Sequence, residues 1–228
     1  MTRLSPKTKR GLSKMVLLGV LGVSVGIVIA ILALTVLPSP LLPGRSGGYE
    51  PTIKVTGGKL APLELTDKYG KKFTLDQVKG KPVLIYFGYT NCPDVCPLVL
   101  QKFKKTIEAL GRDADKIAFI FVSVDPWRDT PETMREYVDR YFDPRIIALT
   151  GTEEQIAKVI LDYKVPVFYT DERGNPVDPA KLPPGSRYFA NHFTWVLGAD
   201  RNHQLILALT PEMLDKEYID ASRYLISR

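Results

Sequence analysis

The sequence predicts an α/β domain that follows an N-terminal membrane-spanning helix, and three features of its 228 residues point to this organisation. An uncharged apolar segment, Met15–Leu37, precedes a stretch rich in Pro and Gly. Beyond it, short apolar runs alternate with segments whose apolar residues recur at helical spacing. The run Pro82–Phe87 is continuously apolar, as in strands that are covered on both faces of a sheet. Together these features indicate one globular domain behind a membrane anchor.

The apolar segment is long enough to cross a bilayer, because at helical rise it spans roughly 34 Å. A removable secretory signal is the alternative, but its apolar stretch would be about 7 to 15 residues long and a small-residue cleavage site would follow. In this chain the apolar segment is longer than that, and it continues into the sequence LPSPLLPG rather than into such a cleavage site. We expect a basic tail over residues 1–14, a transmembrane anchor over 15–37, a Pro/Gly linker over 38–48 and the working domain over 49–228.

The basic tail predicts the orientation of this single-pass anchor, since positive flanks stay in the cytoplasm. The domain would then lie in the periplasm or at the outer face of a bacterial inner membrane. A mitochondrial location is less favoured because few residues precede the anchor.

The formal charge of +6 arises outside the working domain. Six basic residues precede the first acidic residue, Glu50, and beyond them acidic and basic residues balance. A neutral domain lacks the basic surface that nucleic-acid binding requires. We therefore expect no nucleic-acid partner, and a membrane partner through the N-terminal helix.

The element order completes the α/β prediction, with a hairpin expected around Tyr69 and Gly70. The expected strands are Thr52–Thr56, Leu63–Thr66, Pro82–Phe87, Ile117–Val124, Ile146–Leu149, Val165–Tyr169, Thr194–Leu197 and Leu205–Ala208. The expected helices are Leu98–Leu110, one that opens at Thr130-Pro131-Glu132, Thr152–Leu161 and Pro211–Leu225. The segment Asp171–Ala190 is expected to be irregular, since it contains several prolines and glycines.

Both cysteines of the chain, Cys92 and Cys96, lie between a predicted buried strand and a predicted helix. Residues at i and i+4 approach each other on a helix, so the two thiols can grip one ion. A structural disulfide is one alternative, but closing so short a loop would add little stability. Two buried thiols without a role are another, although Pro93 and Asp94 favour an exposed turn. We expect a soft-metal or redox site here.

The segment Tyr86–Pro97, YFGYTNCPDVCP, resembles the signature of the Sco/SenC proteins, the copper assembly factors of cytochrome c oxidase. The segment Val124–Pro131, VDPWRDTP, is similar to a second pattern of that family. His192 also precedes an apolar strand, as the late histidine of the family does. The resemblance extends from about Ile53 to the C-terminus.

This resemblance implies a thioredoxin-like fold and a membrane-anchored copper chaperone whose metal ligands are Cys92, Cys96 and His192. It implies that the cargo, Cu(I) or Cu(II), is delivered to the CuA-bearing subunit of cytochrome c oxidase, with other copper chaperones as further partners. The family usually places Asp before the histidine, whereas this chain has Asn191. The support of the imidazole is therefore expected to differ.

The residue types agree with copper, because thiolates are soft ligands and imidazole accepts copper in either oxidation state. A structural zinc site normally has four protein ligands. His203, the other histidine, is predicted to be a solvated turn residue rather than a ligand. Without the resemblance, His192 alone would be read as a packing residue. Asp125 and Asp129 are predicted either to cap a helix and pair with Arg128 or to support the metal site.

The alternative function is a thiol-disulfide oxidoreductase that reduces client cysteines. Cys92 would attack, since a thiol at a helix N-terminus has a lowered pKa, and Cys96 would resolve the mixed disulfide. The usual redox motif, however, has two residues between its cysteines and this chain has three. A peroxide-reducing enzyme on the same fold is a weaker alternative. The sequence therefore leaves enzymatic activity open.

Overall fold

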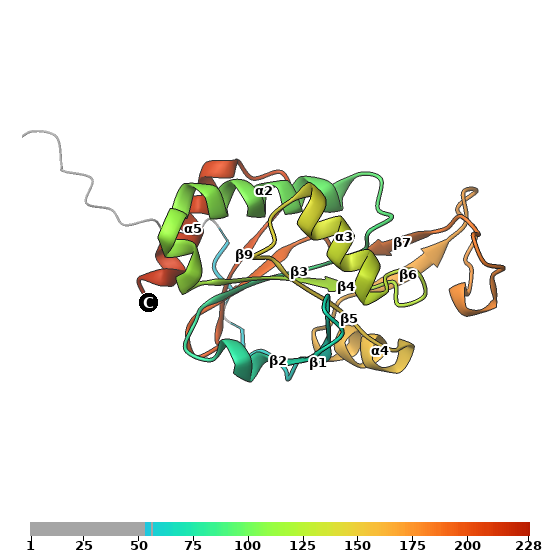
Figure 1. The fold of residues 1–228 in the computed structure, drawn as a ribbon, viewed down its shortest axis with the longest axis horizontal. Coiled ribbons are helices and arrows are strands. Elements are labelled where there is room, and N and C mark those ends of the chain that lie inside the picture. The colour runs from blue at the N-terminus through green and yellow to red at the C-terminus, as the bar shows by residue number, and fades with distance from the viewer. Residues whose placement is uncertain (1–52, 56) are drawn as a thin grey trace, which may run out of the picture. The chain divides into compact units, whose positions relative to one another are not determined.

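The computed structural model describes residues 53–55 and 57–228, which form an α/β domain around a seven-stranded sheet. The strand order is β2-β1-β5-β4-β3-β8-β9, and β6 pairs with β7 in a two-stranded sheet of their own. The strands are β1 Glu64–Asp67, β2 Lys72–Thr74, β3 Val83–Gly88, β4 Ala118–Ser123, β5 Ile147–Thr150, β6 Val167–Thr170, β7 Phe189–His192, β8 Val196–Ala199 and β9 Leu205–Leu209. Figure 1 shows α2, α3 and α5 on one side of the large sheet and α4 on the other.

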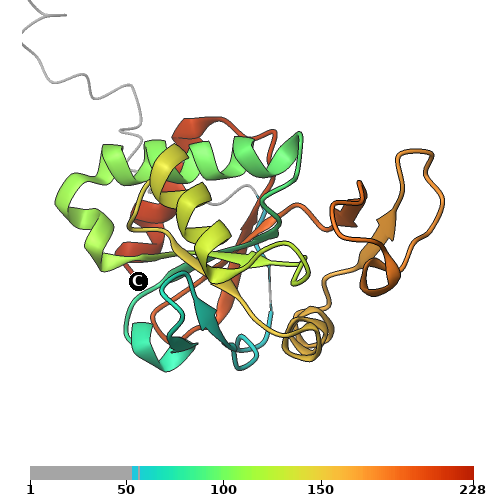
Figure 2. The same ribbon diagram turned by 45° about the vertical axis from the view of Figure 1, so that its right-hand side comes forward.

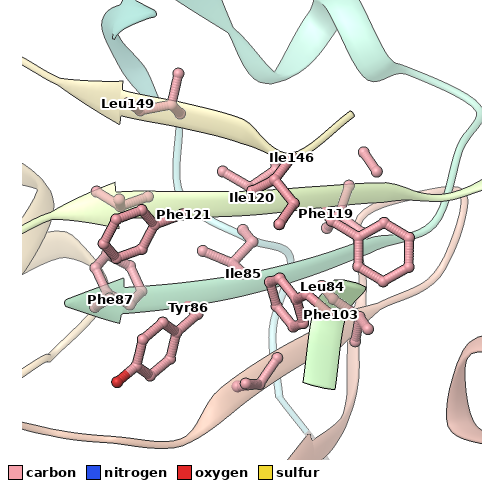
Figure 3. Packing of buried hydrophobic residues seen from close by; sticks show 14 of the residues in the cluster. Leu84, Ile85, Tyr86, Phe87, Phe103, Phe119, Ile120, Phe121, Ile146 and Leu149 are labelled. Atoms are coloured by element: carbon pink, nitrogen blue, oxygen red, sulfur yellow. The ribbon is translucent and has the colours of Figure 1, made fainter. Parts of the chain in front are cut away.

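The centre of the large sheet is made by β3 and β4, which run parallel and are buried at every residue. Figure 3 shows their aromatic side chains packed together, with Tyr86 facing Phe121 and Phe103 of α2 against Phe119. β5 is also parallel to β4. The carboxyl ends of β3, β4 and β5 therefore meet at one edge, and the loops that follow them gather there.

The helices begin where the sequence provides polar caps or turn residues. They are α2 Val95–Leu110, α3 Pro131–Tyr141, α4 Glu153–Asp162 and α5 Asp215–Ile226. Thr130 caps α3 through the backbone N–H of Thr133, and Thr152 forms a capping box with Gln155 on α4. Short 3-10 helices occupy Leu75–Val78, Gly111–Lys116 and Pro179–Lys181.

The ribbon β6–β7 lies beside the carboxyl-end edge of the large sheet, and the loop between its strands extends away from the domain (Figures 1 and 2). Val167 lies opposite His192 and Tyr169 opposite Ala190. Because side chains alternate along a strand, these four residues share one face. Phe168 lies on the other face and is 61% exposed. The ribbon thus presents His192 on its inner face.

Most predicted elements are confirmed, with shifted ends. The hairpin at Gly70 joins β1 and β2. The expected strand 52–56 is not formed as such by its described residues, which make one isolated bridge, from Lys54 to Leu207. Helix α2 begins at Val95 rather than Leu98, because the cysteine motif itself enters the first turn. Helix α5 begins at Asp215 rather than Pro211, after a turn closed by the Met213 N–H on the Thr210 carbonyl.

Two further expectations were wrong. The segment Asp171–Ala190 is not wholly irregular, since its last residues begin β7 and Pro179–Lys181 is helical. His203 does lie in a turn, with a φ of 59°, but it is only 7% exposed. The backbone N–H of Leu60 donates to the His203 carbonyl, so the segment before β1 covers the turn.

The predicted basic tail, anchor and linker lie outside the described residues. Over the part of the chain that the structure describes, no helix has the length and apolar character needed to span a membrane.

We predict that Thr152→Ala lowers the free energy of unfolding by about 1 kcal/mol, because it removes the hydroxyl that accepts from the Gln155 N–H. Urea unfolding of the full-length chain in detergent measures this. Thr152→Ser keeps the acceptor and serves as the matched control. An equal loss in both variants would contradict the capping interpretation.

Candidate metal centre

Cys92, Cys96 and His192 come together although His192 lies far from the cysteines in sequence. Cys92 lies in the loop after β3, Cys96 in the first turn of α2 and His192 at the end of β7. Their ligand atoms all lie within 4.8 Å of one another. Cys96 Sγ and His192 Nε2 are 3.6 Å apart. Among the described residues this is the one group of three or more Cys, His, Asp or Glu side chains arranged to hold a metal ion.

The two cysteines differ in burial, and the expectation of an exposed turn is correct for only part of the motif. Pro93 and Asp94 are exposed and Cys92 is half-buried, but Cys96 has no exposed surface. The Cys96 sulfur lies against the backbone of Gly88, where an added Cβ would be 2.8 Å from it. Both thiols are free. One sulfur therefore faces the solvent side of the site while the other closes its base.

The burial difference divides the pair into a thiolate and a thiol. A hydrogen bond with the Cys96 side chain, together with hydrogen bonds from His192 and backbone N–H groups, lowers the pKa of Cys92 to about 4 against the opposing effect of burial. The Cys96 N–H, at the start of α2, is 3.4 Å from Cys92 Sγ. Burial raises the pKa of the Cys96 thiol well above its usual value. Cys92 is the sulfur ready to bind an ion or attack a disulfide.

Tyr86 belongs to the site, although the sequence did not predict a role for it. Its hydroxyl donates to Cys96 Sγ at 3.4 Å. Burial raises the pKa of Tyr86, so the phenol keeps its proton and remains a donor. The rings of Tyr86 and Tyr89 also contact the His192 ring edge-on, with centroids 6.1 and 5.9 Å away. A tyrosine within a fully buried strand needs a hydrogen-bond partner, and that is the signal that could have identified it.

The imidazole is oriented by the backbone rather than by Asn191. His192 Nδ1 lies 2.9 Å from the carbonyl oxygen of Phe193, which accepts a hydrogen bond when Nδ1 carries the proton. That tautomer leaves the Nε2 lone pair free on the side of Cys96. Asn191 donates instead to Thr170 Oγ1 at 3.0 Å, across the ribbon. The hydrogen-bond acceptor for Nδ1, which an Asp at position 191 could have supplied, is therefore the backbone carbonyl of Phe193.

Asp129 lies outside the ligand group but fixes the loop that carries Cys92. It is buried and accepts from Thr90 Oγ1 at 2.5 Å, from the Thr90 N–H and from Ser123 Oγ at 2.6 Å. Burial raises the pKa of Asp129 to about 6. The carboxylate thus ties the cysteine loop to the end of β4.

Asp125 also lies outside the ligand group, and it pairs with Arg128 as one of the two sequence interpretations expected. Its Oδ2 accepts from Arg128 Nε at 2.6 Å.

The three ligand atoms give the site two chemical capabilities. It can hold a soft metal ion through two sulfurs and a nitrogen, or exchange electrons through its dithiol.

We predict that Cys92 is alkylated by iodoacetamide at a rate that changes little between pH 6 and 8, because its pKa of about 4 makes it a thiolate throughout. The rate at an ordinary thiol, whose pKa is about 8.5, would instead rise about tenfold for each unit by which the pH increases over this range. Mass spectrometry of the reduced full-length chain resolves the two sites, and Cys96 should stay unmodified while folded. A steep rise in the rate at Cys92 would contradict the lowered pKa.

Comparison with known proteins agrees with this geometry. The SCO1/SenC family profile matches residues 56–227. A SCO2-like protein of Rickettsia prowazekii is 33% identical over 94% of this chain and 97% of its own length. The copper-bound structure of Bradyrhizobium japonicum ScoI is 38% identical, with a TM-score of 0.62 over 75% of this chain and 100% of that one. Copper-bound yeast Sco1 is 29% identical, with a TM-score of 0.63 over 75% of this chain and 89% of that one. This chain belongs to the SCO1/SenC family.

Proposed function

We propose that this chain is a copper chaperone that binds one copper ion through Cys92, Cys96 and His192. The observation that carries the proposal is the convergence of these three ligand atoms within 4.8 Å. Two similar structures of the family, ScoI and yeast Sco1, are copper-bound. The chemistry of the donors and the family resemblance therefore support the same cargo.

Cu(I) is the oxidation state that this ligand set favours. Two sulfurs select a soft ion, and one nitrogen completes a three-coordinate site. Metal–sulfur and metal–nitrogen bonds of about 2.3 and 2.0 Å, as zinc shows, would place trigonal S and N ligands about 3.7 Å apart. The Cys96 Sγ to His192 Nε2 distance is 3.6 Å. Cu(II), with the same imidazole, is the second state of the cargo.

Transfer begins at Cys92 in this proposal. Cys92 is half-buried and Cys96 fully buried, so an incoming or receiving thiolate reaches the ion from the Cys92 side. The client is the CuA-bearing subunit of cytochrome c oxidase, as the family resemblance implies, and other copper chaperones are donors or acceptors. Residues 15–37 anchor the domain, residues 38–48 tether it, and residues 49–228 work in the periplasm or at the outer face of a bacterial inner membrane. Tethering raises the local concentration of the domain near a membrane-bound client.

We expect the full-length chain in detergent, loaded anaerobically with Cu(I), to bind one copper ion. His192→Ala should weaken retention against a Cu(I) chelator by about tenfold or more, about 1.4 kcal/mol, because one of three ligands is lost. Metal analysis and competition with bathocuproine disulfonate measure stoichiometry and affinity.

The chain has two histidines, so His203 provides the control. His203→Asn suits a residue at φ 59° and should leave copper binding unchanged. A parent chain that binds no copper, or equal losses in both variants, would overturn the proposal.

A second candidate function is reduction of client disulfides, which the ionised Cys92 favours. Cys92 would attack a client disulfide, releasing one client thiolate and forming a mixed disulfide. Cys96, on losing its proton to solvent, would then attack Cys92, which frees the second client thiol and leaves Cys92–Cys96 oxidised.

For this reaction we expect Cys96→Ala to trap a mixed disulfide between Cys92 and an insulin cysteine, while Cys92→Ala forms none. His192→Ala removes one of the hydrogen bonds that lower the pKa of Cys92 but neither sulfur, so this variant should still reduce insulin at a rate close to the parental rate. Non-reducing electrophoresis and turbidity measure the two outcomes. Activity that survives in Cys92→Ala would rule the scheme out.

A further inference from the structure

A buried polar cluster joins the loop after β4 to the chain just before β7. Asp125 has no exposed surface, and Tyr188 is 5% exposed. The Tyr188 hydroxyl donates to Asp125 Oδ1 at 2.6 Å. A hydrogen bond to a buried carboxylate is short and strong, and losing one leaves an uncompensated acceptor. The loop and the start of β7 are therefore held together at a point from which water is excluded.

Arg128 completes this cluster by contacting both partners. Its Nε donates to Asp125 Oδ2 at 2.6 Å, and its Nη1 donates to the backbone carbonyl of Tyr188 at 3.1 Å. The guanidinium also lies over the Tyr188 ring, 3.5 Å from its centroid. A planar guanidinium makes such bonds and such stacking at once, which a lysine cannot do. We call Asp125, Arg128 and Tyr188 the latch.

The other strand of the ribbon is held at the same place. The Tyr169 hydroxyl donates to the carbonyl oxygen of Val124 at 2.7 Å, and the Tyr169 and Tyr188 rings meet edge-on at 6.2 Å. Val124 and Asp125 are adjacent at the end of β4. Both strands of the ribbon are therefore attached to one short segment of the main domain.

This attachment matters to the metal ligands because they belong to different substructures. Cys92 and Cys96 follow β3 of the large sheet, whereas His192 ends β7 in the two-stranded sheet. Ladder hydrogen bonds of the large sheet therefore do not fix the ribbon that carries His192. The 3.6 Å separation of Cys96 Sγ and His192 Nε2 therefore depends on the contacts that hold the ribbon against the main domain, and those at the β4 end are among them.

We propose that the latch of Asp125, Arg128 and Tyr188 positions the copper ligand His192 by fixing the β6–β7 ribbon to the carboxyl end of β4. The proposal rests on the proposed copper-binding function and names its positioning residues. None of the three needs to touch the ion. Their role is to hold the imidazole where the two cysteine sulfurs already converge.

Tyr188→Phe tests the latch because it removes one hydroxyl and keeps the ring under Arg128. We expect Cu(I) affinity of the full-length chain in detergent to fall by about tenfold, the lower end of what loss of a ligand-supporting contact costs. The probe is Cu(I) in competition with bathocuproine disulfonate. Tyr163→Phe is the matched control, because its hydroxyl donates to the Ala61 carbonyl at 2.8 Å, outside the latch. The control should bind copper like the parent.

A double-mutant cycle separates positioning from general destabilisation. In the His192→Ala background Tyr188→Phe should cause no further loss of affinity, because the ligand that the latch positions is already absent. Hydrogen exchange of the metal-free chain should be faster over residues 189–192 in Tyr188→Phe and unchanged over β3.

The outcomes distinguish the two proposals. Unchanged affinity and exchange in Tyr188→Phe, or an equal loss with and without His192, would overturn the latch while leaving copper binding intact. A parent chain that binds no copper would overturn the proposed function and, with it, the role of the latch in binding.

Discussion

Cys96 can close the base of the metal group because Gly88, at the end of β3, leaves room for its sulfur. A Cβ at Gly88 would meet Cys96 Sγ at 2.8 Å and the Tyr86 ring at 2.9 Å, so any larger residue would displace one of them. The same close packing removes Cys96 from water, raises its pKa and brings it within reach of the Tyr86 hydroxyl. The thiolate of Cys92 and the imidazole of His192 are then arranged around this buried sulfur.

The parallel strands determine where the supporting groups lie. Because β3, β4 and β5 end at the same edge, Thr90, Ser123 and Thr150 can all reach Asp129, the last two near the ends of β4 and β5. Thr90 and Ser123 donate to its carboxylate, and Thr150 Oγ1 donates to its backbone carbonyl at 2.6 Å. One residue thus couples the ends of β4 and β5 to the cysteine loop that follows β3, so a rigid sheet positions a loop that would otherwise be free to move.

The sequence was sufficient for features that depend on local patterns. Apolar runs predicted β3 and β4, and capping residues predicted α3 and α4, because burial and capping require recognisable residue types at defined positions. The β7 strand has no such pattern, since FANH is short, mixes apolar and polar residues and follows a Pro- and Gly-rich segment. Without β7, spacing could not bring His192 to the cysteines, and only the family resemblance did so. Arg128 was a predicted partner of Asp125, but Tyr188, which precedes β7, was hidden for the same reason.

The unequal thiols allow one site to serve both candidate functions, and His192 distinguishes them. An ion meets the ionised Cys92 first, and full coordination then requires Cys96 to lose its proton within a buried setting where Tyr86 donates to its sulfur. Electron exchange needs the same two sulfurs and no third ligand. The ribbon, fixed by buried hydrogen bonds, supplies beside Cys96 the third ligand that metal binding requires and that electron exchange between two sulfurs does not. The conformational cost of ordering that ribbon is therefore best explained by metal binding.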